Sequence, residues 1–214
     1  MYENIIKRWV KKMKKQKEGL VCANMHDLLS LQTRIKAIKS ILPRKTRLFY
    51  AIKANSNANI LETLFPHIDG FEVASLGELR KVRHISEETP VLFSGSGIQD
   101  DELEQALQAG VSYIHVKSLL ELRKLIHVAS DLNQDINTLI RINLHEHTLP
   151  VTNVTLAGKP SPFGMDEWTT EEALAILQDV ENTHVHFQGF HVVSGIDLLR
   201  YSSFGPESSK LEFV

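Results

Sequence analysis

Short apolar segments alternate with amphipathic helical segments along most of this chain, and this alternation restricts the fold more than any other feature. It favours parallel strands joined by right-handed helical crossovers, and therefore an α/β fold. The strands are expected at 48–53, 71–74, 91–93, 113–116, 138–143 and 185–192. The helices are expected at 27–41, 58–65, 76–85, 100–109, 119–129 and 170–180. The sequence thus predicts six strand–helix units with one parallel sheet.

Three of the expected helices begin with a capping-box pattern, in which a hydroxyl and a glutamate bind free backbone N–H groups. These are Ser75-Leu-Gly-Glu78, Ser118-Leu-Leu-Glu121 and Thr169-Thr-Glu-Glu172. Gly110 is a plausible stop for the helix before it. We therefore interpret Ser75 and Glu78 as helix caps and not as catalytic residues.

The composition is that of an ordinary soluble globular protein of 214 residues, 43% hydrophobic and 23% charged. A net charge of −2 argues against a general nucleic-acid-binding role. The chain has no apolar run long enough to span a membrane and no apolar signal-peptide core near its start. Cys22 is the only cysteine, which excludes an internal disulfide and fits a reducing cytoplasm.

Residues 7–17 are strongly basic, but apolar side chains recur among residues 5–13 at helical spacing. One interpretation is a membrane-surface or nucleic-acid-binding arm. We favour a short amphipathic helix that packs on the body or on a partner subunit and ends at Gly19. Residues 20–23 are expected to form a short strand.

Lys53 closes the apolar segment 48–53 and stands directly before a helix start. In a strand, Phe49, Ala51 and Lys53 alternate onto one face, so the lysine would point inward. Burial lowers the pKa of a lysine, which is also how a lysine becomes a nucleophile able to form a Schiff base with a carbonyl. The alternative is a lysine at the end of the strand that reaches solvent.

Six sequence blocks in a fixed order connect this lysine to a known family. They are Phe49-Tyr-Ala-Ile-Lys-Ala-Asn55, Gly70-Phe-Glu-Val-Ala-Ser-Leu-Gly-Glu-Leu79, Phe93-Ser-Gly-Ser-Gly97, Leu139-Ile-Arg-Ile-Asn143, Ala157-Gly-Lys-Pro-Ser-Pro-Phe-Gly164 and Gly189-Phe-His-Val-Val-Ser-Gly195. Together they resemble the pyridoxal-phosphate-dependent decarboxylases of the alanine-racemase-like barrel type, such as ornithine and diaminopimelate decarboxylases. The blocks around Phe71 and Ala157 are most similar to the branch in siderophore biosynthesis, where the decarboxylated amino acid is attached to citrate.

The resemblance implies a parallel βα barrel of the TIM type, of which this chain would supply about six of eight units. A complete barrel takes about 250 residues, and relatives add a C-terminal β domain, so the chain is too short for both. We expect residues 1–25 to contribute a helix and a strand to that missing domain. Residues 26–195 would form the partial cofactor-binding barrel, and residues 196–214 a divergent or truncated tail.

The resemblance also assigns roles to individual residues. Lys53 would hold pyridoxal 5′-phosphate covalently, and His191 would stack on its ring; these two are the expected catalytic residues. Ser194 would help to hold the phosphate, with Arg141 near the cofactor and Glu72 beside the ring. Each has a structural alternative: an exposed lysine, a core histidine, a Ser-Gly turn, an ion-paired arginine and a solvated carboxylate.

Departures from the family pattern weaken parts of this interpretation. Relatives commonly have proline at the position of Ser96 and lysine at that of Ile98, which argues against a role for the loop 94–98. The glycine-rich phosphate loop, the acidic partner of the pyridine nitrogen and the Cys-Asp and Tyr elements completing a dimeric site fall outside the matched blocks. We therefore expect this chain alone to hold the cofactor poorly.

Two pairs of histidines lie at spacings that suit zinc, His145 with His147 and His184 with His186. Neither pair has a third ligand at suitable spacing, so we expect no metal site.

The predicted function is decarboxylation of an amino acid, or of a citrate-linked amino acid, that binds as a small molecule in the cytoplasm. The full-length protein is expected to be a homodimer with no nucleic-acid or membrane partner. An amino-acid racemase of the same barrel type remains an alternative. A non-catalytic fragment or pseudoenzyme that pairs with a full-length homologue is another.

Overall fold

The computed structural model describes residues 2–16, 23–143, 164–179 and 184–192. The strands are β1 (Phe49–Ala51), β2 (Gly70–Val73), β3 (Val91–Phe93), β4 (Tyr113–Val116), β5 (Ile136–Ile142) and β6 (Val185–Val192). The α-helices are α1 (Tyr2–Gln16), α2 (Leu28–Ile41), α3 (Ala58–Leu64), α4 (Leu76–Ile85), α5 (Asp100–Gln108), α6 (Leu119–Leu132) and α7 (Glu167–Leu177). Two short 3₁₀ helices, η1 (Ile52–Ala54) and η2 (Phe65–His67), complete the described elements.

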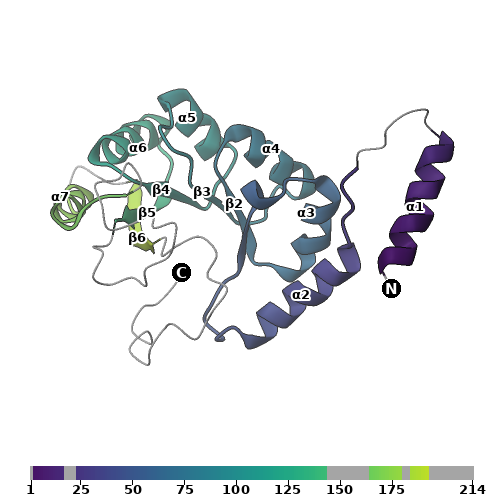
Figure 1. Ribbon diagram of the computed structural model, residues 1–214. Coiled ribbons are helices and arrows are strands. Elements are labelled where there is room, and N and C mark those ends of the chain that lie inside the picture. The colour runs from purple at the N-terminus through teal and green to yellow at the C-terminus, as the bar shows by residue number, and fades with distance from the viewer. Residues whose placement is uncertain (1, 17–22, 144–163, 180–183, 193–214) are drawn as a thin grey trace.

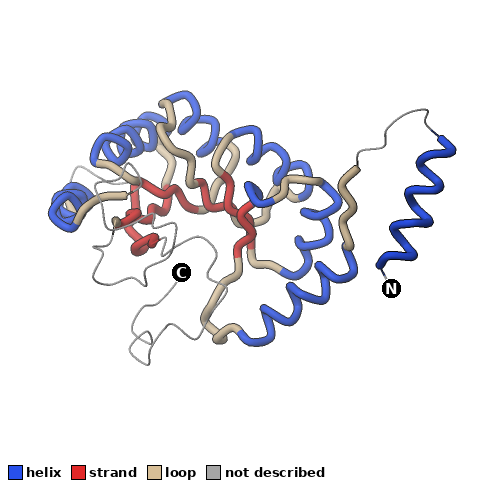
Figure 2. The backbone as a smooth tube through the Cα atoms, viewed as in Figure 1, coloured by secondary structure: helices blue, strands red, loops and turns tan. Residues whose placement is uncertain are grey.

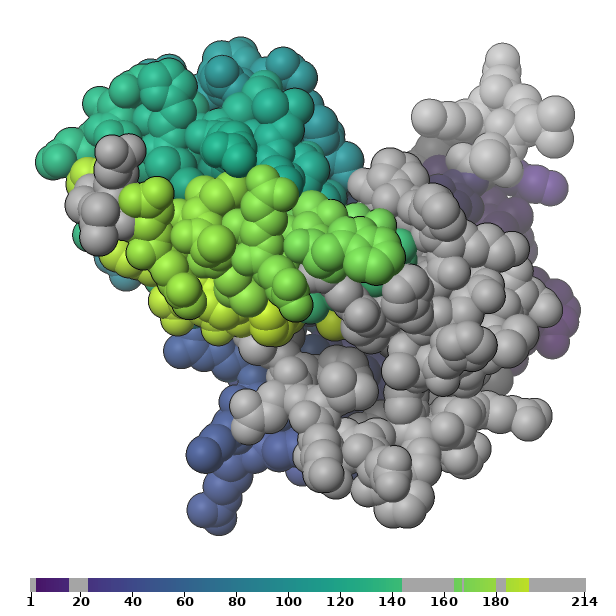
Figure 3. All heavy atoms as spheres, turned by 90° about the vertical axis from the view of Figure 1, so that its left-hand side faces the viewer, coloured from purple at the N-terminus to yellow at the C-terminus, as the bar shows by residue number. Residues whose placement is uncertain are grey.

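The six strands form one parallel sheet whose spatial order follows the chain, from β1 to β6. The helices that connect the strands lie along one side of the curved sheet, and no helix among the described residues lies on its inner side (Figures 1 and 2). At the end of this row, α7 lies beside α6 and β6 (Figure 3). The prediction of a parallel sheet with helical crossovers is confirmed.

Alternate residues of each strand pack against these helices and form the main core. In β4, for example, Ile114 and Val116 are both about 1% exposed and belong to the core cluster. Because successive side chains of a strand point to opposite faces, the residue between them faces the inner side of the sheet. The core side chains that are nearly inaccessible include Phe71, Val73, Phe93, Ile140, Leu79, Leu107, Leu122 and Leu125.

Two of the three predicted capping boxes are present. The Ser75 hydroxyl accepts a hydrogen bond from the Glu78 N–H at 3.3 Å, and the Glu78 carboxylate accepts one from the Ala74 N–H at 2.7 Å. Ser118 and Glu121 cap α6 in the same way. Their role as caps is what the pattern predicted.

The prediction of the third capping box, at Thr169–Glu172, is wrong, because α7 begins at Glu167, three residues before the predicted start. The reason lies in the sheet: the Met165 N–H donates to the Arg141 carbonyl at 2.8 Å, which attaches this segment to the end of β5. The next residue, Asp166, is the N-cap. The Thr170 hydroxyl therefore lies inside the helix and donates to the Asp166 carbonyl at 2.9 Å.

The first strand is also shorter than predicted, since β1 ends at Ala51 and Lys53 lies in η1. The chain turns here because Ile52 is fully buried in the core, which starts the return of the backbone toward α3. Lys53 is consequently exposed at the end of the strand and not an inward-facing strand residue.

The basic N-terminal segment is helical, as predicted, but its apolar side chains are not covered. Ile5, Ile6, Trp9 and Val10 are all more than one-third exposed, and Figure 1 shows α1 apart from the sheet and its helices. Packing on the body is therefore not observed, whereas packing on a partner subunit stays a prediction. Most of the predicted strand 20–23 lies outside the described residues. None of the described helices has the length and apolar composition needed to cross a bilayer.

Candidate active site

Four of the predicted site residues lie at the carboxyl-terminal edge of the sheet. Lys53 lies in η1, two residues after the end of β1. Glu72 is the third residue of β2, and Arg141 and His191 lie near the ends of β5 and β6. Arg141 and His191 are paired in the register of these two strands. Since all strands run in the same direction, their carboxyl ends meet at one edge, which is where parallel βα barrels carry their active sites.

Glu72 is held by a residue of the loop after β3. The Ser94 hydroxyl donates a hydrogen bond to the Glu72 carboxylate at 2.6 Å. A hydrogen bond to an ionised acceptor is stronger than one between neutral groups. The contact thus holds the carboxylate at the inner face of the sheet.

His191 packs against a second histidine, His115 of β4. Their ring centroids are 4.3 Å apart and their planes are inclined at 41°. Burial, with the positive charges of Arg141, Lys117 and Lys53 as smaller causes, lowers the pKa of His191 to about 4. Burial likewise lowers the pKa of His115 to about 2. Both imidazoles are therefore uncharged at neutral pH.

Lys117 lies in the turn after β4 and is only 4% exposed. Its ammonium group donates a hydrogen bond to the Gly95 carbonyl. Burial lowers the pKa of Lys117, and the negative charges of Glu121 and Glu72 oppose this change. A buried ammonium with carboxylates nearby is the arrangement in which a lysine is retained inside a protein.

Arg141 is partly buried, and its backbone is fixed because its carbonyl accepts the hydrogen bond from Met165. Burial lowers the pKa of Arg141, whereas the charge of Glu72 acts in the opposite direction. An arginine remains protonated under any condition in which proteins fold. The guanidinium therefore adds a permanent positive charge to this edge of the sheet.

The charges and rings at this edge suit a flat, anionic group. Lys53, Lys117 and Arg141 supply positive charge, and their fields all reach the ring of His115. Both nitrogens of His115 and Nδ1 of His191 are buried without a hydrogen-bond partner among the described residues. Cationic side chains bind phosphates and carboxylates, and neutral imidazoles pack on aromatic rings. The residues present thus fit a phosphorylated aromatic cofactor.

The structure brings together Lys53, Glu72, Arg141 and His191, as the motifs predicted. Ser194 lies outside the described residues.

Sequence reasoning missed Ser94, His115 and Lys117. The loop 94–98, for which departures from the family pattern weakened any role, supplies contacts at this edge: Ser94 donates to Glu72, and Gly95 accepts from Lys117. Ile98 stands where relatives commonly have lysine. It is 6% exposed and packs in the core, so it cannot take the part of a charged side chain. The available signal was alternation: His115 lies within β4 and Lys117 directly after it, both at positions that alternate with Ile114 and Val116.

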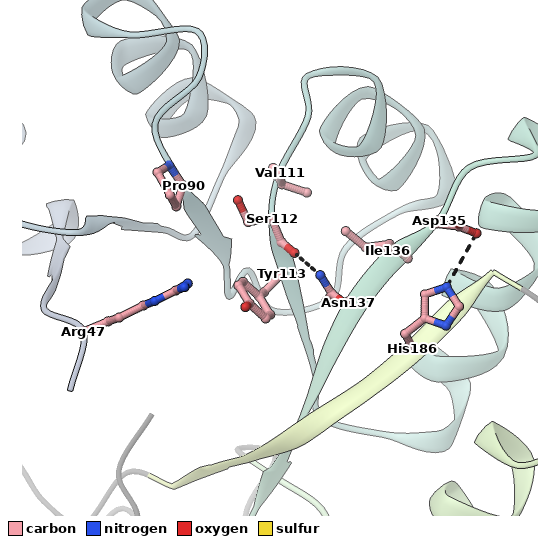
Figure 4. A pocket seen from close by; sticks show the side chains of 9 residues that line it. All are labelled: Arg47, Pro90, Val111, Ser112, Tyr113, Asp135, Ile136, Asn137 and His186. Atoms are coloured by element: carbon pink, nitrogen blue, oxygen red, sulfur yellow. Dashed lines mark hydrogen bonds and ion pairs between the residues drawn. The ribbon is translucent and has the colours of Figure 1, made fainter. Parts of the chain in front are cut away.

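A cavity of about 350 Å³ lies at the opposite, amino-terminal edge of the sheet (Figure 4). Its lining includes Arg47, which precedes β1, and Tyr113 at the start of β4. Asp135 lies on the other side, 3.6 Å from His186 and 3.0 Å from His184. The cavity is therefore separate from the cluster at the carboxyl ends.

No metal-binding group of side chains occurs in the part of the chain that the structure describes, and this part includes His184 and His186. His145 and His147 lie outside it.

Sequence comparisons identify the family. Residues 28–203 match the pyridoxal binding domain of the pyridoxal-dependent decarboxylases. A relative from Staphylococcus aureus, 2-[(L-alanin-3-ylcarbamoyl)methyl]-2-hydroxybutanedioate decarboxylase, is 36% identical over 80% of this chain and 42% of its own length. The L-glutamyl-[BtrI acyl-carrier protein] decarboxylase of Niallia circulans is 30% identical over 81% of this chain and 40% of its own length.

Solved structures share the fold. Diaminopimelate decarboxylase from Helicobacter pylori, complexed with L-lysine, superposes with a TM-score of 0.72 at 23% identity, covering 91% of this chain and 47% of that one. Alanine racemase from Clostridium difficile 630 gives a TM-score of 0.57 at 18% identity, covering 78% of this chain and 42% of that one. Our chain spans less than half the length of the curated relatives it matches. It belongs to the pyridoxal-dependent decarboxylases, enzymes whose cofactor is pyridoxal phosphate, and its residues 28–203 match their pyridoxal binding domain.

Proposed function

We propose that the protein decarboxylates a small amino-acid substrate with pyridoxal phosphate attached to Lys53. The observation that carries this proposal is the cluster at the carboxyl ends of the strands. There, an exposed lysine shares one edge of the sheet with two further cations, a carboxylate and two neutral imidazoles. When bound, pyridoxal phosphate supplies an electron sink for the carbanion that remains after carbon dioxide departs.

Lys53 is the residue proposed to attach the cofactor. Its position in η1, directly after β1, places the amine at the edge of the sheet, where its side chain is exposed. An exposed amine can reach an incoming aldehyde without first leaving a buried partner. The alternation of Phe49 and Ala51 predicted an inward-facing strand position for Lys53. The exposed position in η1 favours attachment of the cofactor more than that position would.

His191 is proposed to provide a flat, neutral surface for the cofactor ring. Because its pKa is lowered to about 4, it is uncharged at pH 7 and adds no positive charge beside Arg141. Glu72, held by Ser94, is proposed to lie beside the ring as a fixed acceptor. Ser194, which lies outside the described residues, is proposed to help hold the phosphate.

Arg141 and Lys117 are proposed to bind and orient anionic groups of the cofactor or substrate. Both side chains are at least partly buried, and interactions with anions are stronger there than in bulk water. The Staphylococcus aureus relative acts on a citrate-derived amide of an amino acid, as its name states. We propose a substrate of the same class for this protein, an amino acid or citrate-linked amino acid, in siderophore biosynthesis.

We further propose that the full-length protein is a cytoplasmic homodimer. The exposed apolar side chains of α1 support the idea that residues 1–25 pack on a second domain or subunit. In this proposal residues 26–195 form the cofactor-binding part of the barrel and residues 196–214 a divergent tail. The use of a single cysteine fits a reducing compartment.

Peptide mass mapping after addition of pyridoxal phosphate and reduction with borohydride tests the role of Lys53. We expect a pyridoxyl adduct mainly on the peptide that contains Lys53, and none there in Lys53→Ala. Lys45→Ala is the matched control, because Lys45 is also an exposed lysine outside the cluster. Labelling spread evenly over the exposed lysines of the unaltered chain would contradict the proposal.

Release of carbon dioxide from the substrate distinguishes a decarboxylase from a racemase of the same barrel type.

A further inference from the structure

His115 is a buried polar residue that no step of the proposed chemistry uses. It is 2% exposed, and neither of its ring nitrogens has a hydrogen-bond partner among the described residues. Buried polar side chains are hydrogen-bonded in the large majority of cases. Retaining an unpaired imidazole here costs stability, and leucine or phenylalanine would fill the same space without that cost. The position therefore requires a reason other than core packing.

The strand geometry shows what His115 contacts. Its neighbours Ile114 and Val116 belong to the core under the helices, so His115 faces the inner side of the sheet. His115 pairs with Leu139 of β5, and β5 in turn pairs with β6 through Arg141 and His191. The two imidazoles thus reach across the strand that separates them, with ring centroids 4.3 Å apart.

Packing, and not hydrogen bonding through Nδ1, orients the ring of His191. Its Nδ1 is buried and has no partner within the described part of the chain. The ring contact with His115 is therefore a defined restraint on the plane of this imidazole. Aromatic pairs at this separation favour a limited set of inclinations.

The charge on both rings matters for this contact. His191 contacts His115 on β4, and the charged groups that act on it are Lys117 after β4, Arg141 on β5, Glu72 on β2 and Lys53 in η1. Three of these five are cations, so protonation of either imidazole would add repulsion to the cluster. Uncharged rings can pack closely.

We propose that His115 is a positioning residue for His191: it supports one side of the imidazole from β4 and keeps the ring in the orientation that receives the cofactor. This inference rests on the proposed role of His191 and adds a residue that acts through it. His115 itself is not assigned a contact with substrate or cofactor.

The test compares three variants of the whole chain with the unaltered protein. His115→Phe retains a flat ring but no ring nitrogens, whereas His115→Ala removes the ring. His127→Ala is the control, since His127 is exposed on α6 and pairs only with Asp131 among the described residues. Thermal unfolding shows which variants are folded before any other measurement is made.

The first readout needs no cofactor. The pKa of His191 is followed by NMR with labelled histidine, starting from a value of about 4. In His115→Ala, water gains access to His191, and its pKa is expected to rise toward the ordinary value, by about one unit or more. His115→Phe and the His127 control are expected to keep it low.

The second readout is the dissociation constant for pyridoxal phosphate, measured by absorbance. We expect His115→Ala to raise it roughly threefold to tenfold, the range of one lost aromatic-pair contact. His115→Phe is expected to stay within about twofold of the unaltered chain, because the ring contact is kept.

Two results would overturn the proposal. One is a folded His115→Ala chain in which neither the pKa of His191 nor the cofactor affinity changes. The other is His115→Phe weakening cofactor binding as much as His115→Ala, which would mean that ring packing is not the relevant property. If His115→Ala does not fold, the decision rests on His115→Phe and on the nuclear Overhauser contact between the two histidine rings in the unaltered chain. Absence of borohydride labelling at Lys53 would count against the proposed function alone, because the NMR measurement is independent of cofactor.

Discussion

The two faces of the same parallel sheet have opposite character. The face toward the helices carries Phe71, Phe93 and Ile114, which are nearly inaccessible and form one continuous core. The inner face carries Glu72 and His115, with Ser94 and Arg141 beside them, and its contacts include hydrogen bonds, charge interactions and the ring contact of His115 with His191. A single strand of four residues contributes side chains to both faces of the sheet. Alternation along a strand therefore lets a single segment stabilise the fold and build a polar site.

A further difference lies between the two edges of the sheet. At the amino-terminal edge, His184 and His186 face Asp135, whose side chain is 70% exposed. At the carboxyl-terminal edge, His115 and His191 are buried, and burial is the largest cause of their lowered pKa values. The same residue type thus pairs with an exposed carboxylate at one edge and forms a buried, packed pair at the other.

The largest expected effect concerns the helix-covered face. Leu122→Ala in α6 removes a side chain that is 0% exposed and should lower the free energy of unfolding by about 2–5 kcal/mol, through lost burial and the cavity left behind. Leu120→Ala is the matched control, because Leu120 lies on the same helix but is 66% exposed. Urea denaturation measures both. Equal destabilisation by the two variants would mean that the helix packs through a different face.

A second prediction concerns the inner face at low pH. His115 and His191 have a lower pKa in the folded chain than the ordinary value of 6.5. Between about pH 6.5 and pH 4, the unfolded chain therefore takes up protons that the folded chain does not. Stability should be highest above this window and should fall with decreasing pH by up to about 1.4 kcal/mol per pH unit for each histidine.

Urea denaturation at half-unit steps of pH checks this expectation. His115→Phe should remove the contribution of His115 to the slope, whereas Leu122→Ala should lower stability without changing the slope. A slope that is the same in His115→Phe and in the unaltered chain would show that His115 titrates normally.

The smallest expected effect concerns the hydrogen bond on Glu72. Ser94→Ala removes the donor 2.6 Å from the Glu72 carboxylate and should destabilise the chain by about 1 kcal/mol. Ser40→Ala is the control, since the Ser40 hydroxyl is exposed and bonds to a carbonyl of its own helix; its loss should cost less than about 0.5 kcal/mol. If the two substitutions have the same effect, Glu72 is held by contacts other than Ser94.

Much of the secondary structure could be predicted because its causes are local. The bounds of α4 and β4 agree with the predicted ones, since a capping serine and an apolar run are sufficient to define them. The errors occur where distant contacts compete with local preference. The start of α7 is set by the attachment of Met165 to β5, and the end of β1 by the burial of Ile52.

The candidate site was predictable in part for the same reason. Lys53, Glu72, Arg141 and His191 could be found because they lie in motifs of a known family. His115 and Lys117 belong to no such motif, and their importance depends on neighbours more than twenty residues away in the chain. Ser94 was found in a motif but dismissed because its loop departs from the family pattern.

The sequence by itself determined the alternation of strands and helices, the caps and the family, because periodicity, turn chemistry and motifs are properties of short segments. Only the tertiary structure decided which polar side chains share the inner face of the sheet and which of them are uncharged. The physical reason is that desolvation and charge–charge interactions depend on what surrounds a group in space. For His115 and His191, those surroundings come from four strands and the turn after β1.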